Sequence, residues 1–245
     1  MNYILILLTT FVITASRPAD TPTKPVAQPV VVLELFTSQG CSSCPPADKA
    51  LQDITQQAAR SGQTVYGLSF HVDYWNRLGW QDPFSAKQFT DRQRQYDKSL
   101  NSQIYTPQLV INGRQQVVGG QRGQIEQAIQ TIQKQSASDF VGVDGSVRRD
   151  AKQVNVSYSL SSSGPYRVNV ALVQKEAHTA VKNGENGGRT LVNMNVVREF
   201  KSIDEAKTSG NTTLTLPAGL PADQTAVLVY VQRIDNGQIV GAKQL

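Results

Sequence analysis

The first half of the chain alternates between apolar runs and amphipathic stretches that predict a mixed α/β fold. Residues 30–36 form an apolar, β-branched run with one interruption, typical of a strand buried on both faces of a sheet. Residues 47–60 carry apolar side chains at helical spacing and follow two prolines, which a first helical turn tolerates. Residues 65–72 predict a second strand. A strand, a helix and a strand in this order favour a parallel strand pair.

The rest of this half predicts a helical aromatic insertion and an antiparallel edge. Residues 73–103 hold both tryptophans of the chain and contain a helical pattern over 86–100. Asn112-Gly113 is a strong hairpin turn signal. The remaining elements expected here are strands over 108–111 and 116–118 and an amphipathic helix over 123–135.

The second half of the chain predicts strands alone. After Phe140, short alternating segments separated by Gly, Pro, Asn and Asp replace the helical patterns. The seven segments cover residues 143–149, 153–160, 166–174, 191–200, 212–216, 226–233 and 238–243. This pattern is typical of an antiparallel sandwich. We therefore expect an α/β domain over residues 29–138, followed by an all-β, sandwich-like domain over residues 139–245.

The N-terminal segment predicts a targeting signal. Residues 3–15 are apolar, but this run is shorter than the roughly 20 residues of a spanning helix, and it ends in small residues. We interpret residues 1–16 as a signal peptide, although no Lys or Arg precedes the run; an uncleaved anchor is the alternative. Residues 17–28, rich in proline, predict a linker. We expect an exported protein, periplasmic or secreted, without stable membrane insertion after signal cleavage.

Composition and charge narrow the class of partner. Hydrophobic residues make up 39% of the 245 residues and charged residues 18%, as in ordinary soluble globular proteins. The net charge of +5 comes from scattered Lys and Arg residues and not from a run. Nucleic acids attract clustered positive charge, so we expect no nucleic-acid partner.

Two cysteines, Cys41 and Cys44, are the clearest chemical feature. Their spacing alone fits a structural disulfide, a metal site with His71 as third ligand, or a redox-active pair. The pair lies between a buried strand and a helix N-terminus, where backbone N–H groups and the helix dipole stabilise a thiolate. This context favours redox chemistry, with Cys41 exposed as the attacking thiolate and Cys44 covered as the resolving thiol.

A proline loop agrees with a redox site. Thr106-Pro107 precedes a predicted strand, where proline is allowed and a cis bond would suit a tight approach. Together with the stretch from Val32 to Cys44 and the 112–113 hairpin, this loop resembles the thioredoxin superfamily. The resemblance implies a thioredoxin-like α/β fold for the first domain and a catalytic Cys41–Cys44 disulfide. It also implies that Pro107 is a cis-proline, preceded by Thr106, that faces the disulfide. The longer stretch from the cysteines to this proline, and the Ser-Ser between the cysteines, depart from ordinary thioredoxins.

Further motifs resemble a secreted bacterial family known as domain of unknown function 1223. They are Glu34–Asp48, Ser69–Trp75, Leu78–Phe84, Tyr105–Gln108, Gly184–Leu191 and Asn195–Arg198. The resemblance covers nearly the whole chain after its N-terminal segment. It implies the fold and the thiol site but supplies no substrate.

Other candidate site residues each have a structural alternative. Glu34 interrupts a buried strand and is a candidate for proton transfer; alternatively it is paired with a Lys or Arg, because an unpaired buried charge is costly. His71 is a candidate for proton transfer or a hydrogen-bonded structural histidine. Tyr74, Trp75 and Trp80 are candidates for a substrate groove, or they form a small core under the insertion.

The glycine-rich segment 184–189 also has two interpretations. It is a turn explained by its glycines alone, or it cradles an anion or reaches across to the thiol site.

The predicted function is an exported thiol–disulfide oxidoreductase that acts on protein thiols or disulfides, with no cofactor and no metal ion. One alternative is a binding or assembly module in which the cysteine pair is a passive disulfide. The other is a Cu(I) metallochaperone with Cys41, Cys44 and His71 as ligands.

Overall fold

The computed structural model describes residues 24–204 and 207–245, so the predicted signal peptide at 1–16 lies outside the described residues. Within these ranges the chain forms three α-helices and eleven strands. The helices are α1 (Pro45–Arg60), α2 (Lys87–Leu100) and α3 (Arg122–Gln133). The strands are β1 (Val31–Thr37), β2 (Val65–His71), β3 (Gln108–Ile111), β4 (Gln115–Val118), β5 (Val143–Arg149), β6 (Gln153–Leu160), β7 (Tyr166–Ala180), β8 (Thr190–Ile203), β9 (Ser209–Thr215), β10 (Thr225–Arg233) and β11 (Ile239–Gln244). None of the helices in this part of the chain has the length and apolarity needed to cross a membrane.

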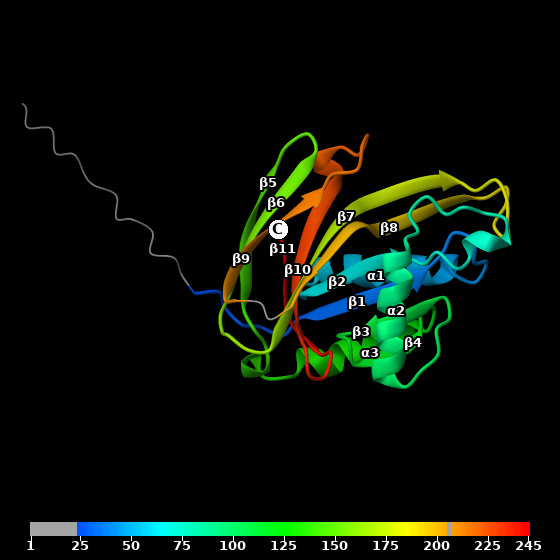
Figure 1. Cartoon of the computed structure of the whole chain (residues 1–245). Coiled ribbons are helices and arrows are strands. Elements are labelled where there is room, and N and C mark those ends of the chain that lie inside the picture. The colour runs from blue at the N-terminus through cyan, green and yellow to red at the C-terminus, as the bar shows by residue number, and fades with distance from the viewer. Residues whose placement is uncertain (1–23, 205–206) are drawn as a thin grey trace, which may run out of the picture.

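Eight of these strands form one mixed sheet in the order β11-β10-β7-β8-β2-β1-β3-β4 (Figure 1). As predicted, β1 and β2 run parallel, and β3 and β4 form an antiparallel hairpin at one edge. The β7–β8 hairpin enters the sheet beside β2, where Ser69 pairs with Val196 in parallel register. The strands β5, β6 and β9 form a second, three-stranded antiparallel sheet.

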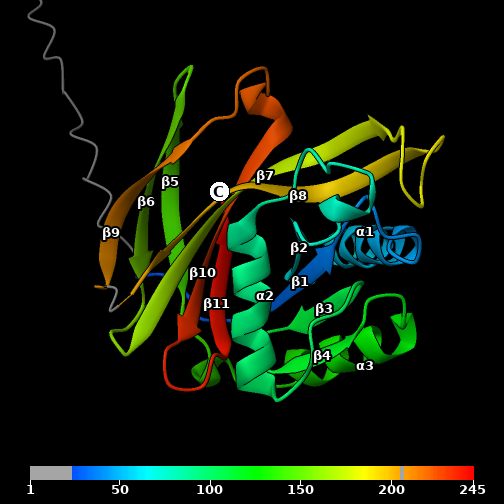
Figure 2. The same cartoon turned by 45° about the vertical axis from the view of Figure 1, so that its right-hand side comes forward.

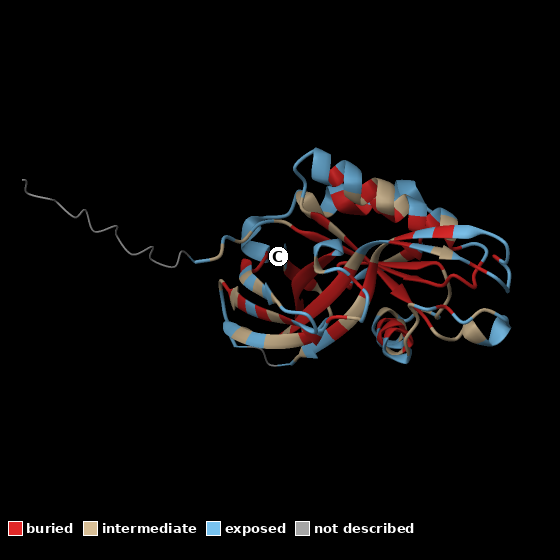
Figure 3. Ribbon diagram, turned by 90° about the horizontal axis from the view of Figure 1, so that it is seen from above, coloured by how far each residue is buried: buried red, intermediate tan, exposed pale blue. Residues whose placement is uncertain are grey.

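Three apolar clusters fill the space on the two faces of the large sheet. The helix α2 covers one face through Phe89 and Tyr96, which pack with Val32 and Phe36 of β1 (Figure 2). On β1 the alternate side chains, such as Leu33, belong to the cluster of α1 and α3, as the period of two in a strand requires. At the other end of the large sheet, β7 and β10 pack against the three-stranded sheet. The buried residues therefore run between these layers, and the exposed residues lie on the outer helix faces (Figure 3).

The predicted fold class, a thioredoxin-like α/β domain with a helical insertion followed by an all-β sandwich, is wrong. The structure is mostly β, and its large mixed sheet takes strands from both halves of the chain. Both β7 and β8 extend beyond the predicted segments 166–174 and 191–200, and β8 hydrogen-bonds to β2. Apolar periodicity indicates which residues form strands but not which strands pair, because the same alternation fits either partner. The domain boundary at residues 138 and 139 stays a prediction.

A buried ion pair also joins the two halves. Glu34 of β1 accepts hydrogen bonds from Arg92 of α2 at 2.8 Å and from Tyr230 of β10 at 2.8 Å, and a third from Tyr96. The guanidinium of Arg92 stacks over Phe200 at 4.8 Å. The structure thus supports the second interpretation of Glu34, a carboxylate paired with an arginine.

Candidate disulfide site

The cysteine pair lies where β1 gives way to α1. Cys41 and Cys44 form a disulfide with a Cα–Cα distance of 5.4 Å. Cys44 is the residue before the first helical turn, and its carbonyl accepts the backbone N–H of Ala47 at 2.9 Å. The pair therefore sits at a helix N-terminus directly after a buried strand, as the sequence predicts, and the helix dipole there favours a thiolate.

Both cysteines are fully buried, each with 0% exposure, so the prediction of an exposed Cys41 is wrong. The turn between β7 and β8 is bound to the backbone of the disulfide loop. Asn186 in this turn donates from Nδ2 to the carbonyls of Gln39 and Cys41, both at 2.9 Å. The neighbouring Glu185 accepts the backbone N–H of Ser42 at 2.9 Å. Of the two interpretations of the glycine-rich segment, the structure places it across the thiol site.

The Thr106-Pro107 loop stands at the same end of the sheet. Its peptide bond is cis, as the resemblance implies. Gln108, the residue after Pro107, pairs with Phe36, so the proline lies beside the end of β1. A Cβ added at Gly119 would stand 3.3 Å from the Cβ of Pro107 and 2.9 Å from that of Ala47 in α1. The proline loop and the first turn of α1 therefore converge.

The aromatic residues of the insertion support the loops around the disulfide. Trp75 donates from Nε1 to the Thr106 hydroxyl at 2.8 Å and packs against Gly40, where an added Cβ would stand 3.4 Å from the Cβ of Trp75. Trp80 donates from Nε1 to the Gln39 side chain at 3.2 Å. Tyr74 is half-buried and packs on the α2 side of the sheet. Their predicted role as a substrate groove stays a prediction.

Gln39 connects the disulfide loop to the β7–β8 hairpin. Its side-chain amide donates to Thr179 in β7 and to Asn193 in β8, both at 2.9 Å. Its backbone N–H donates to Asp82 at 2.8 Å. The second half of the chain thus completes the site, because β8 supplies Asn193 and the turn supplies Asn186.

Asp82 links this network to His71. Its Oδ2 lies 2.7 Å from Nδ1 of the fully buried imidazole. Burial acts to raise the pKa of Asp82, but the charge of His71 and its hydrogen bonds outweigh it, so this pKa is lowered. Burial acts to lower the pKa of His71, but the Asp82 carboxylate outweighs it and the pKa is raised. His71 is therefore a hydrogen-bonded histidine, and its predicted part in proton transfer stays a prediction.

Asp48 is a buried carboxylate with a free oxygen beside this network. It lies four residues after Cys44, in the first turn of α1, and is 7% exposed. Oδ2 accepts from Asn193 at 3.3 Å, whereas Oδ1 has no hydrogen-bond partner among the described residues. The Thr37 hydroxyl and Nε2 of His71 also make no hydrogen bond of ordinary geometry with the described residues. Burial raises the pKa of Asp48 to about 7, although the charge of His71 and the nearby Thr37 hydroxyl lower it.

The described residues do not offer a complete set of metal ligands at this site. Across residues 24–204 and 207–245, no three or more His, Cys, Asp or Glu side chains are grouped to hold a metal ion. Nδ1 of His71 is already bonded to Asp82. The second histidine, His178, is exposed and lies against Glu176.

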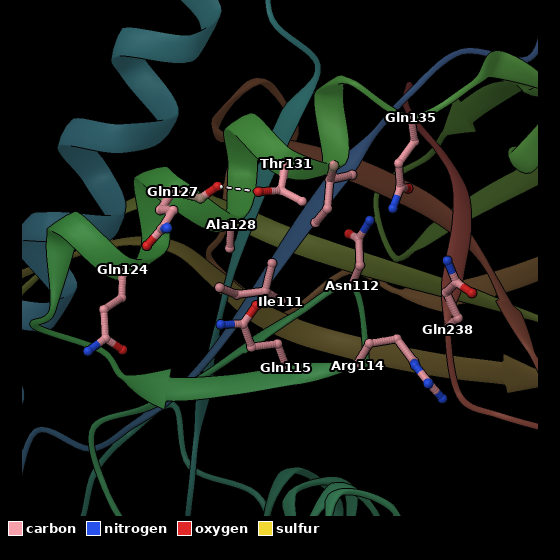
Figure 4. A pocket seen from close by; sticks show the side chains of 11 residues that line it. Ile111, Asn112, Arg114, Gln115, Gln124, Gln127, Ala128, Thr131, Gln135 and Gln238 are labelled. Atoms are coloured by element: carbon pink, nitrogen blue, oxygen red, sulfur yellow. Dashed lines mark hydrogen bonds between the residues drawn. The ribbon is translucent and has the colours of Figure 1, made fainter.

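A separate cavity of about 600 Å³ lies between the β3–β4 hairpin and α3 (Figure 4). Amide side chains, among them Gln115, Gln124 and Gln135, line most of it, together with Arg114. It shares no lining residue with the disulfide site.

The fold and the site define a mostly β protein with a buried Cys-x-x-Cys disulfide at a helix N-terminus. The chain belongs to the family described as protein of unknown function (DUF1223), whose model matches residues 32–232.

Two solved structures are similar to the chain to very different degrees. A crystal structure of a protein from Agrobacterium tumefaciens is 31% identical, over 88% of this chain and 93% of that chain, with a TM-score of 0.63. A domain of the outer membrane lipoprotein Omp28 from Porphyromonas gingivalis is 12% identical, over 43% of this chain and 85% of that chain. Its TM-score is 0.24. No curated protein matches the chain.

The sequence reasoning missed several residues of the site, above all Gln39, Asp48 and Asn186. Asp48 carried a detectable signal, because it falls between Ala47 and Leu51 on the apolar face of the predicted helix. A carboxylate on an apolar face, four residues after the second cysteine of the pair, is a candidate for proton transfer. The two amides carried no such signal, since their roles depend on contacts across more than 140 residues of sequence.

Proposed function

We propose that this protein is a thiol–disulfide oxidoreductase whose redox pair is Cys41 and Cys44, and that its site is of the thioredoxin-like kind. The observation that carries the proposal is the disulfide at the N-terminus of α1, with the Thr106-Pro107 loop and the first turn of α1 both next to Gly119. A helix N-terminus lowers the pKa of a thiol and so supplies the nucleophile that disulfide exchange needs.

The proposed reaction transfers two electrons from the protein dithiol to a substrate disulfide. The Cys41 thiolate attacks one sulfur of the substrate, a mixed disulfide forms, and the first substrate thiolate leaves and takes up a proton. Cys44 then loses its proton and attacks Sγ of Cys41. The mixed disulfide breaks, the second substrate thiolate leaves, and the Cys41–Cys44 disulfide remains. Oxidation of a substrate dithiol is the reverse sequence.

Asp48 is suited to accept the proton of Cys44 in the second step. It is one helical turn away on the same side of α1, and its Oδ1 has no partner among the described residues. A pKa of about 7 lets it take up and release a proton near neutral pH. Glu34 is unsuited to this role, because its carboxylate is held by Arg92, Tyr96 and Tyr230.

The test is the reduction of insulin disulfides by dithiothreitol, with and without the protein. Cys41→Ser should abolish the catalysed rate, and Cys44→Ser should accumulate a mixed disulfide that appears on non-reducing gels. Lys49→Ala, an exposed change on the same helix, should keep the wild-type rate. Full activity of Cys41→Ser would refute the proposal.

The passive disulfide is the second candidate, and the complete burial of both cysteines favours it. A structural disulfide resists reduction, with a potential below about −300 mV, whereas catalytic pairs lie well above that value. Equilibration with glutathione buffers measures the potential. A value below about −300 mV would favour the passive disulfide.

Export and protein partners belong to this proposal as well. A disulfide persists in oxidising compartments, so the proposed site of action is the periplasm or the extracellular space. Fractionation of cells that produce the full chain tests it, and protein retained in the cytosol would contradict it.

A further inference from the structure

We infer that the turn 184–188 between β7 and β8 occupies the position of the substrate, and that the substrate is a polypeptide segment which displaces this turn. The inference rests on the proposed function, because it concerns the substrate class of the same disulfide.

The turn makes specific polar contacts at the disulfide. Asn186 is fully buried, and both its amide hydrogens are used on the carbonyls of Gln39 and Cys41. Its Oδ1 accepts from Arg189 at 2.8 Å, which holds the amide in this orientation. Glu185 takes the N–H of Ser42, the residue directly after Cys41. Asn186 and Glu185 thus occupy hydrogen-bonding positions on these backbone groups that a bound segment would need.

The donor and acceptor pattern of these contacts identifies the displacing group. The disulfide loop offers two carbonyls, on Gln39 and Cys41, and one N–H, on Ser42. An extended polypeptide presents N–H and C=O groups in alternation and can satisfy both kinds. A small dithiol has no amide N–H to give to the carbonyls. The side chains of the turn therefore make the hydrogen bonds that a bound peptide backbone would make.

The turn is built to move as a unit. Gly184 and Gly188, at its two ends, have φ values of +75° and +81°, which glycine adopts without strain. Gly184 rests on the insertion, where an added Cβ would stand 3.2 Å from the Cβ of Trp80. Besides Asn186, the residues of the turn from 184 to 188 are exposed. Its hold on the disulfide loop thus depends on a few hydrogen bonds and little apolar burial.

The turn occupies the substrate position in closed molecules, so only molecules with a displaced turn can bind substrate. The apparent affinity is therefore the intrinsic affinity multiplied by the fraction of such open molecules. Loss of the Asn186 contacts should therefore lower KM and leave kcat unchanged, because chemistry at the cysteines follows opening. Two hydrogen bonds of ordinary strength correspond to about a tenfold change in the opening equilibrium.

The test compares Asn186→Ala with Asn183→Ala in the full chain. Asn183 is an exposed asparagine of the same loop, and its change should have no effect. For insulin as substrate, we expect Asn186→Ala to lower KM about tenfold with kcat within about twofold of wild type. The rate at which dithiothreitol reduces the Cys41–Cys44 disulfide, followed by thiol alkylation, should rise by a similar factor. If Asn186→Ala matches Asn183→Ala in both assays, or lowers kcat at constant KM, the inference is wrong.

A second pair of variants covers the case in which Asn186→Ala does not fold. Glu185→Ala removes the acceptor for the Ser42 N–H and should lower KM about threefold, whereas Glu185→Gln keeps an acceptor and should stay near wild type. Equal effects of the two variants would overturn the inference.

The dithiothreitol assay also separates this inference from the proposed function. It needs no catalysis, so it reports on the turn even if Cys41→Ser shows that insulin reduction is not the activity. Faster reduction by dithiothreitol with an unchanged KM for insulin would overturn the polypeptide assignment.

Discussion

Two buried carboxylates differ in how completely they are hydrogen-bonded. Glu34 lies on β1 and is bonded to α2, and Asp48 lies in the first turn of α1. Glu34 is fully buried, with bonds to both oxygens from an arginine and two tyrosines. Asp48 is nearly as buried, yet one oxygen has no partner among the described residues. The first carboxylate forms an ion pair with Arg92, and the second has a pKa raised by burial to about 7.

The difference separates a structural carboxylate from a candidate for proton transfer. A fully satisfied ion pair holds elements together, and any change of its protonation is costly. A buried carboxylate with a free oxygen costs stability, and such groups are found where a proton must move. Glu34 thus connects β1 to α2 and to Tyr230 of β10, whereas Asp48 lies one helical turn after Cys44.

The largest expected effect is on the Glu34 pair. Glu34→Gln should lower the free energy of unfolding by about 3–5 kcal/mol, because Arg92 is left as an unpaired buried charge. Urea denaturation measures it. Asp91→Ala, which removes a surface partner of Lys87, should have little effect on stability. A loss as small for Glu34→Gln as for Asp91→Ala would break the comparison.

Replacement of Asp48 should raise the free energy of unfolding, whereas replacement of Glu34 should lower it. Its folded pKa of about 7 exceeds the ordinary 3.8, so the native state binds the extra proton and wild-type stability falls as the pH rises between these values. Asp48→Asn removes this loss and should be more stable than wild type at pH 8, by up to about 4 kcal/mol. Denaturation at about pH 4 and pH 8 checks it, and the difference should vanish at the lower pH.

Activity provides the control for Asp48. If this carboxylate takes the proton of Cys44, Asp48→Asn should slow insulin reduction about a hundredfold at pH 7 while it stabilises the fold. A variant that is stabilised and fully active would leave Asp48 without a part in proton transfer.

The smallest effects concern tyrosine hydroxyls. Tyr96 donates to Glu34, so Tyr96→Phe should lower the free energy of unfolding by about 1.5–3 kcal/mol. The Tyr74 hydroxyl lies near Gln93 and Thr106 but makes no hydrogen bond of ordinary geometry with the described residues, so Tyr74→Phe should stay within about 0.5 kcal/mol of wild type. Thermal or urea unfolding of both variants sharpens the contrast between bonded and unbonded polar groups.

Much of the secondary structure was predictable from the sequence, because periodicity reflects burial directly. The segments 108–111, 143–149 and 153–160 match β3, β5 and β6 residue for residue. The prediction was weaker for β7 and β8, whose ends project beyond the predicted segments and carry mixed polar and apolar residues. The ends of this hairpin are the part that reaches the disulfide.

The sequence by itself determined the strands and helices, the cysteine pair at a helix N-terminus and the proline loop, since each follows from local spacing. Only the tertiary structure decided that β8 joins β2, that Asn186 binds the Cys41 carbonyl, and that Asp48 and not Glu34 has an oxygen without a hydrogen bond among the described residues. The physical reason is that a polar side chain carries no mark of its distant partner. Glu34 and Asp48 are both acids in apolar surroundings, and only the folded neighbours decide which is paired and which is free to exchange a proton.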